Sequence, residues 1–171
     1  GAYEFKDPAV ISQLVELVTK EGKSPKTEFV GKSAKYILDK IGITVGDDVK
    51  VILMEAKEDH PFVQVELMMP ILPLVRVPDV DQAIEMAVRV EHGNRHTAMM
   101  HSRNVEKLTK MAKLIQTTIF VKNGPSYAGI GVGGEGYTTF TIAGPTGEGL
   151  TSAKSFARRR RCVLVGGMDV R

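Results

Sequence analysis

Residues 71–101 read ILPLVRVPDVDQAIEMAVRVEHGNRHTAMMH, and the spacing of their apolar residues changes twice. The run 71–77 is short and rich in branched apolar residues, which is typical of a strand. From 79 to 90 the apolar residues recur at helical spacing, and 97–101 has the character of a further small strand. Strand, helix and strand in this order indicate an α/β layered domain with mainly parallel pairing.

The same alternation continues on both sides of this segment. Asp7 followed by Pro8 predicts a helix start, because the carboxylate can accept from free amides and the proline ring already has a helical φ. The expected helices and strands of the flanking segments lie at 8–20, 31–41, 49–54, 105–115 and 117–121, and Asn104 is expected to cap the helix over 105–115. We therefore expect residues 1–171 to form a single α/β domain, a layered and mainly parallel sheet flanked by helices.

The composition changes towards the carboxyl end, since nine of the seventeen glycines lie within residues 124–149. This segment is expected to be a loop, interrupted by a strand at 137–142 and followed by a helix over 150–159. Arg158 to Arg161 are expected to form a solvated helix end, and 162–165 a last strand with Cys162 as a buried apolar residue. The apolar tail leaves a purely structural role in oligomerisation open.

Composition and charge exclude several classes of protein. Lys and Arg total 23 and Asp and Glu total 20, and this small excess is too local to indicate nucleic-acid binding. The sequence contains no apolar run of about 20 residues and no signal-peptide pattern, so we expect a cytoplasmic protein without a membrane span. One cysteine cannot form an internal disulfide.

Two glycine-rich strings resemble nucleotide-binding motifs but depart from them. Residues 131–136 match G-x-G-x-x-G, yet a strand-like run follows where the dinucleotide motif needs a helix. Residues 144–151 approach the phosphate-loop pattern, but Leu150 stands in place of its lysine. What remains is a glycine-rich turn before a helix, so a standalone module that binds a phosphorylated ligand stays an alternative.

The histidines do not predict a metal site. His92 and His96 have the spacing of a helical pair, but Gly93 is expected to end the helix between them. We interpret His96 as a single imidazole at a strand edge, available as a base or as a hydrogen-bond donor. The paired carboxylates at 47–48, 58–59 and 79/81 are interpreted as turn and cap residues.

Five strings, read in order, carry a family resemblance over essentially the whole chain. They are HPFV at 60–63, ELMMPILP at 66–73, RHTA at 95–98, TTIFVKN at 117–123 and FTIAGPTGEGLTSA at 140–153. Together they resemble the carboxyl-terminal part of the CoA-acylating aldehyde dehydrogenases of the propionaldehyde and acetaldehyde type. The resemblance implies an aldehyde-dehydrogenase-like catalytic domain.

Members of this family are longer than this chain. They carry an amino-terminal Rossmann domain and a nucleophilic cysteine upstream of the matched region, and Cys162 does not correspond to that cysteine. The resemblance implies that a short-chain aldehyde, CoA and NAD are converted to acyl-CoA and NADH through a thiohemiacetal and a thioester. The isolated chain would then be inactive, and the whole enzyme would be a homo-oligomer, cytoplasmic or inside a bacterial microcompartment.

The resemblance also assigns roles to individual residues. Glu66 matches the glutamate that binds the nicotinamide ribose, and Met68 occupies a position where many relatives have an aromatic residue against the nicotinamide. His96 matches the histidine of the His-Thr motif and is the candidate for acid–base or CoA-stage chemistry. Thr141, Ile142 and Ala143 would lie near a pocket for a short acyl group.

Overall fold

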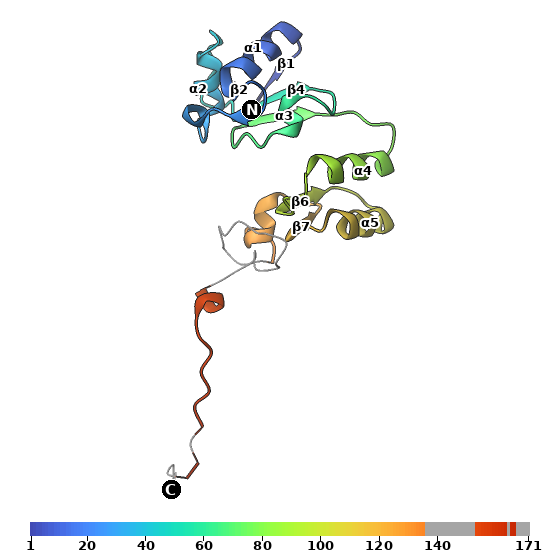
Figure 1. Cartoon of the computed structure of the whole chain (residues 1–171). Coiled ribbons are helices and arrows are strands. Elements are labelled where there is room, and N and C mark those ends of the chain that lie inside the picture. Colours follow the sequence, from blue (N-terminus) through green and yellow to red (C-terminus); the bar gives the residue numbers. More distant parts are fainter. Residues whose placement is uncertain (136–152, 164, 167–171) are drawn as a thin grey trace. The chain divides into compact units, whose positions relative to one another are not determined.

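The structure of the chain is a computed structural model, and it describes residues 1–135, 153–163, 165 and 166. The chain divides into two compact units, Gly1–Gly93 and Asn94–Arg171, and Figure 1 shows their elements. Each unit contains a sheet of parallel strands accompanied by helices. The α/β class and the mainly parallel pairing predicted from the sequence are therefore confirmed.

The first unit is built on a three-stranded parallel sheet in the order β1-β4-β5. Its elements are β1 (Ala2–Phe5), α1 (Pro8–Val18), β2 (Thr19–Lys20), β3 (Ser24–Pro25), the 3₁₀ helix η1 (Thr27–Phe29), α2 (Ala34–Asp39), β4 (Val51–Glu55), α3 (Pro61–Gln64), β5 (Ile71–Leu74) and α4 (Val80–Val90). The central strand β4 pairs Ile52 with Tyr3 on one side and with Ile71 on the other. Only β2 and β3 pair antiparallel among the described strands.

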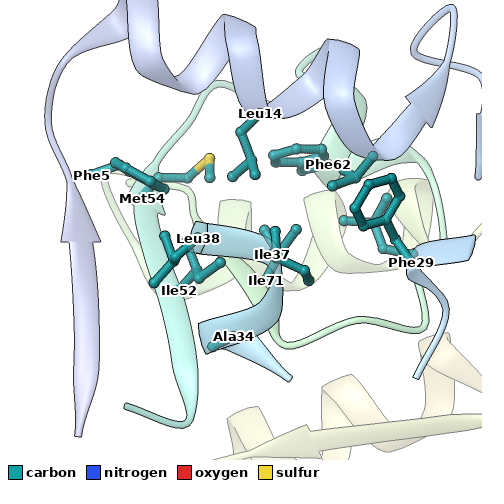
Figure 2. Close-up of a cluster of buried hydrophobic side chains, with 12 residues drawn as sticks. Phe5, Leu14, Phe29, Ala34, Ile37, Leu38, Ile52, Met54, Phe62 and Ile71 are labelled. Atoms are coloured by element: carbon teal, nitrogen blue, oxygen red, sulfur yellow. The ribbon is translucent and has the colours of Figure 1, made fainter. Parts of the chain in front are cut away.

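Apolar side chains from the sheet and its helices form one core in this unit. Figure 2 shows them gathered together, with Leu14 beside Met54 and with Leu38 beside Ile52. Leu14, Ile37, Leu38, Ile52 and Met54 are completely buried. Burial of this apolar surface, worth about 25 cal/mol per Å², is the main force that holds β4 between its neighbours.

The second unit contains a two-stranded parallel sheet. Its elements are β6 (Thr97–Met100), α5 (Val105–Ile115), β7 (Ile119–Lys122) and the 3₁₀ helices η2 (Ser126–Ile130) and η3 (Ala153–Phe156). Thr97 is paired with Ile119 at the start of the two strands. Helix α5 connects the strands and buries one stripe of side chains, made up of Leu108, Met111 and Ile115.

The helix starts follow the capping residues. Asp7 accepts from the amide of Ala9 at 2.9 Å, and Asn104 accepts from the amide of Lys107 at 3.0 Å, as the sequence predicted. Asp79 caps α4 in the same way, through the amide of Gln82. Ser33 caps α2, so this helix begins at Ala34 rather than at 31, and it ends at Asp39 rather than at 41.

The predictions for the carboxyl-terminal segment were partly wrong. Residues 137–142 and 144–151 lie outside the described residues, as does the first part of the expected helix 150–159. Its described part is the 3₁₀ helix η3, and residues 157–159 are not helical. The described residues of 162–165 form no strand and Cys162 is exposed, whereas the sequence predicted a buried strand.

The physical reason is that β-propensity alone does not make a strand. A run such as Cys-Val-Leu-Val becomes a buried strand only when a neighbouring strand supplies hydrogen bonds and a surface to pack against. Among the described residues no strand pairs with this segment. The four arginines before it are exposed, as expected, although they do not follow an α-helix.

In the described part of the chain, each helix is too short or too polar to cross a bilayer.

Truncation of Ile52 should destabilise the first unit strongly. Ile52 is completely buried on the central strand, and an Ile→Ala change at such a site costs about 2–5 kcal/mol through lost transfer energy and the cavity that remains. Leu72→Ala is the matched control, because Leu72 lies on the neighbouring strand β5 and is 50% exposed. Urea denaturation followed by circular dichroism measures both variants, and equal losses would contradict this description of the core.

Candidate functional site

Glu66 lies in the loop that joins α3 to β5, and its side chain is exposed. The next residue, Leu67, is buried in the core and so anchors the loop to the first unit. The Glu66 carboxylate has no hydrogen bond or ion pair with the residues that the structure describes. Both oxygens are therefore free to accept, which suits a pair of neighbouring hydroxyl groups such as those of a ribose.

Helix α3 sets the position of this loop. His60 precedes the helix, and its Nδ1 accepts from the amide of Phe62 at 3.1 Å, while Pro61 occupies the first helical position. Phe62 is buried, and its ring lies edge-on to the His60 imidazole with ring centroids 5.2 Å apart. Partial burial lowers the pKa of His60, so that the neutral form needed for capping is favoured.

Met68 stands at the wall of an open pocket. Its φ of +54° is uncommon for a residue other than glycine, and its carbonyl accepts from the amide of Gly31 at 3.0 Å. The side chain is 56% exposed. The pocket has a volume of about 750 Å³ and is lined by Gly31, Lys32, Ser33, Ala34, Lys35, Asp47, Val49, Lys50, Met68, Met69 and Pro70.

The polar wall of this pocket is basic. Lys35 and Asp47 form an ion pair at 2.9 Å, and the hydrogen bond between them raises the pKa of Lys35 and lowers that of Asp47. The ammonium of Lys32 lies 5.5 Å from the centroid of the Tyr36 ring. Since the lysines and Asp47 reach solvent, their contribution to stability is small. The pocket thus combines cationic groups with an exposed apolar surface at Met68.

His96 immediately precedes β6 in the second unit, and its side chain is exposed. Its Nδ1 lies 2.6 Å from the hydroxyl oxygen of Thr97. On the backbone, the carbonyl of His96 accepts from the amide of Ile119 at 3.1 Å. The imidazole is therefore presented to solvent from a backbone that β7 holds in place.

Two sets of candidate residues remain, the histidine pair and the residues expected at an acyl pocket. His92 and Gly93 both have positive φ after α4, so His92 and His96 do not share a helix, as expected. No group of three His, Cys, Asp or Glu side chains close enough to hold a metal ion occurs within the described residues. Thr141, Ile142 and Ala143 lie outside the residues that the structure describes. Glu66 and Met68 share one loop of the first unit, whereas His96 belongs to the second.

Sequence reasoning missed Asn123, which ties together the carboxyl ends of β6 and β7. Its side-chain oxygen accepts from the amide of Ser102 at 2.7 Å, and its amide nitrogen donates to the Ser102 carbonyl at 2.9 Å. The φ of Asn123 is +56°, a conformation that asparagine tolerates better than most residues. The Asn-Gly pair at 123–124 directly after a strand is the signal that could have indicated this turn.

Comparison with known proteins gives a consistent result. Residues 49–147 match the model of the aldehyde dehydrogenase family. Propanal dehydrogenase (CoA-propanoylating) of Salmonella typhimurium is 52% identical over 165 residues, which are 96% of this chain and 35% of that protein. This chain therefore spans about a third of the length of that curated relative.

Two solved structures extend the comparison to three dimensions. The propionaldehyde dehydrogenase of Rhodopseudomonas palustris, crystallised with bound CoA and an acylated cysteine, is 70% identical with a TM-score of 0.89, over 100% of this chain and 39% of that one. An enzyme from the fucose utilisation microcompartment of Clostridium phytofermentans is 48% identical with a TM-score of 0.85, over 100% and 39% of the two chains. These matches confirm the resemblance and the fold, and they give no support to a standalone phosphate-binding module.

The capping role of His60 should make stability depend on pH. Because burial lowers the pKa of His60 in the folded chain, the unfolded chain takes up this proton first as the pH falls through about 6.5. The free energy of unfolding should therefore decrease between pH 7.5 and pH 5.5, and His60→Asn, which can cap but cannot titrate there, should reduce that slope. The exposed His92→Asn is the control, and the prediction fails if both variants change the slope equally.

Proposed function

Since the chain belongs to the aldehyde dehydrogenase family, we propose that it is the carboxyl-terminal portion of the catalytic domain of a CoA-acylating aldehyde dehydrogenase. The complete enzyme would convert a short-chain aldehyde, CoA and NAD to acyl-CoA and NADH. The observation that carries this proposal is the identity of 52% to a CoA-propanoylating propanal dehydrogenase over 96% of the chain. The 70% identity to a propionaldehyde dehydrogenase crystallised with CoA supports the same reaction class.

The loop at 66–68 suits the nicotinamide end of the cofactor. NAD, when bound, supplies the hydride acceptor for oxidation of the aldehyde carbon. The two oxygens of the Glu66 carboxylate, which have no partner among the described residues, fit the ribose hydroxyls, and the exposed side chain of Met68 offers an apolar surface. Leu67 holds both residues by its burial, so their backbone positions are set before the cofactor arrives.

His96 is the residue of this chain proposed to act on the reacting groups. Its imidazole is exposed. Because Nδ1 is already hydrogen-bonded to the Thr97 hydroxyl, Nε2 is the nitrogen proposed to contact a substrate. A donor at this place would stabilise negative charge on the oxygen of a tetrahedral intermediate, while a base would accept the proton of the CoA thiol. Thr141, Ile142 and Ala143 are proposed to line the pocket for the short acyl group.

The remaining parts of the enzyme must come from a longer polypeptide. We propose that the preceding segment supplies the Rossmann domain and the nucleophilic cysteine, because the relatives are about three times as long as this chain. Cys162 does not take that role in the proposal, and the isolated chain is expected to be inactive. Homo-oligomerisation, a cytoplasmic location and enclosure in a microcompartment belong to the same proposal, the last because one structural neighbour comes from such a compartment.

A chimeric enzyme tests the reaction directly. Residues 1–171 would replace the matched segment of the Rhodopseudomonas palustris propionaldehyde dehydrogenase, and NADH formation would be followed with propanal, CoA and NAD. The chimera should form NADH and propanoyl-CoA, whereas the isolated chain should form neither, because it lacks the nucleophile. A correctly folded chimera without NADH formation would reject the proposed function.

Within that chimera, Glu66→Gln should weaken the use of NAD. The amide keeps one acceptor oxygen but loses the charge, so KM for NAD should rise roughly tenfold, the effect of weakening one charge-assisted hydrogen bond. Glu28→Gln serves as the control, since Glu28 is an exposed glutamate of η1 in the same unit. Steady-state kinetics at varied NAD compare the two variants, and an unchanged KM in Glu66→Gln would remove Glu66 from the cofactor site.

A further inference from the structure

The backbone on either side of the His96 ring is fixed by hydrogen bonds to the neighbouring strand. The carbonyl of Arg95 accepts from the amide of Thr118 at 2.9 Å, and that of His96 accepts from Ile119 at 3.1 Å. Thr97, the next residue, is the first residue of β6 and is paired with Ile119 in the sheet. The hydroxyl of Thr97 therefore reaches the imidazole from a strand position rather than from a loose turn.

The direction of the hydrogen bond between Thr97 and His96 is linked to the tautomer of the ring. The two atoms are 2.6 Å apart, so one of them donates to the other. If the hydroxyl donates to Nδ1, its proton is satisfied and the ring takes the Nε2–H form, which is also the more stable tautomer of a free histidine side chain. If Nδ1–H donated instead, the hydroxyl proton would have no acceptor among the described residues.

We propose that Thr97 is a positioning residue that holds His96 in its Nε2–H tautomer, so that His96 serves as a hydrogen-bond donor. The ring is exposed, and Nε2 has no hydrogen-bond partner in the described part of the chain. An Nε2–H group can donate to a carbonyl oxygen or an oxyanion, but in this state it cannot accept the proton of a thiol. The role of His96 towards a substrate rests on the proposed function, whereas its tautomer does not.

The tautomer can be measured in the 171-residue chain itself. With ¹⁵N-labelled histidine, two-dimensional NMR at a pH where the ring is neutral should give two well-separated His96 nitrogen signals, with the proton on Nε2. His96→Gln identifies these signals by their loss. Thr97→Val should bring the two nitrogen chemical shifts closer together, as expected for a mixture of both tautomers. Thr97→Ser, which retains a hydroxyl, should give the original pattern.

Thr117→Val is the matched control on the adjoining segment. The Thr117 hydroxyl donates to the carbonyl of Ile119 at 2.8 Å, close to the same strand ends but not to the ring, so its removal should leave the His96 signals unchanged. A proton on Nδ1 in the unmodified chain, or signals that Thr97→Val does not move, would overturn the inference. The backbone amide spectrum shows whether each variant is folded, and Thr97→Ala, which also removes the hydroxyl, provides the test should Thr97→Val unfold.

The chimeric enzyme separates this inference from the proposed function. There Thr97→Val should lower kcat roughly tenfold with little change in KM for propanal, and Thr97→Ser should recover most of the rate. An unchanged kcat would overturn the positioning role. A chimera that is inactive even with Thr97 present would instead reject the proposed function, and the NMR measurement would still decide the tautomer.

Discussion

Parallel pairing around β4 is the constraint on which the first unit depends. Because parallel strands cannot be joined by a tight turn, each strand must be followed by a connection that crosses the sheet before the next strand begins. The connection from β4 to β5 contains α3 and then Glu66, Leu67 and Met68. Burial of Leu67 and Ile71 in the same core as Ile52 therefore fixes the backbone position of Glu66, whose side chain is exposed.

Both described candidate residues with chemical roles precede the amino end of a parallel strand. Glu66 comes before β5 and His96 comes directly before β6. The usual expectation for open parallel sheets places ligands beyond the carboxyl ends of the strands. That rule would have directed attention to residues such as Asn123, which holds β6 and β7 together at that edge. Only the resemblance of the string at 66–73 to a known family indicated Glu66. His96 was noted from its place before a strand as an available imidazole, and the resemblance of the string at 95–98 added its candidate role.

The sequence predicted the fold where the signals were local. Asp7 and Asn104 marked helix starts because a side-chain acceptor must meet free amides there, and both caps are present.

The features that the sequence did not predict depend on distant partners. Strand β1 was missed, since Ala2–Phe5 becomes a strand by pairing with residues near position 52, which no local pattern reveals. For Cys162 the pattern predicted burial, but burial needs a partner surface that a single sequence does not specify. The positive φ of Met68 likewise accompanies a hydrogen bond from the amide of Gly31, a residue distant in the sequence, to the Met68 carbonyl.

Two histidines illustrate how the same group acquires different roles. In the composition they are equivalent, but the Nδ1 of His60 faces a backbone amide, which can only donate, so that nitrogen must be the acceptor. This hydrogen bond between the Phe62 amide and His60 is partly buried, and it caps the start of α3. His96 meets a hydroxyl, which can donate or accept, and its ring is exposed. The partner of Nδ1 and the exposure of the ring thus distinguish a structural imidazole from an imidazole that faces solvent.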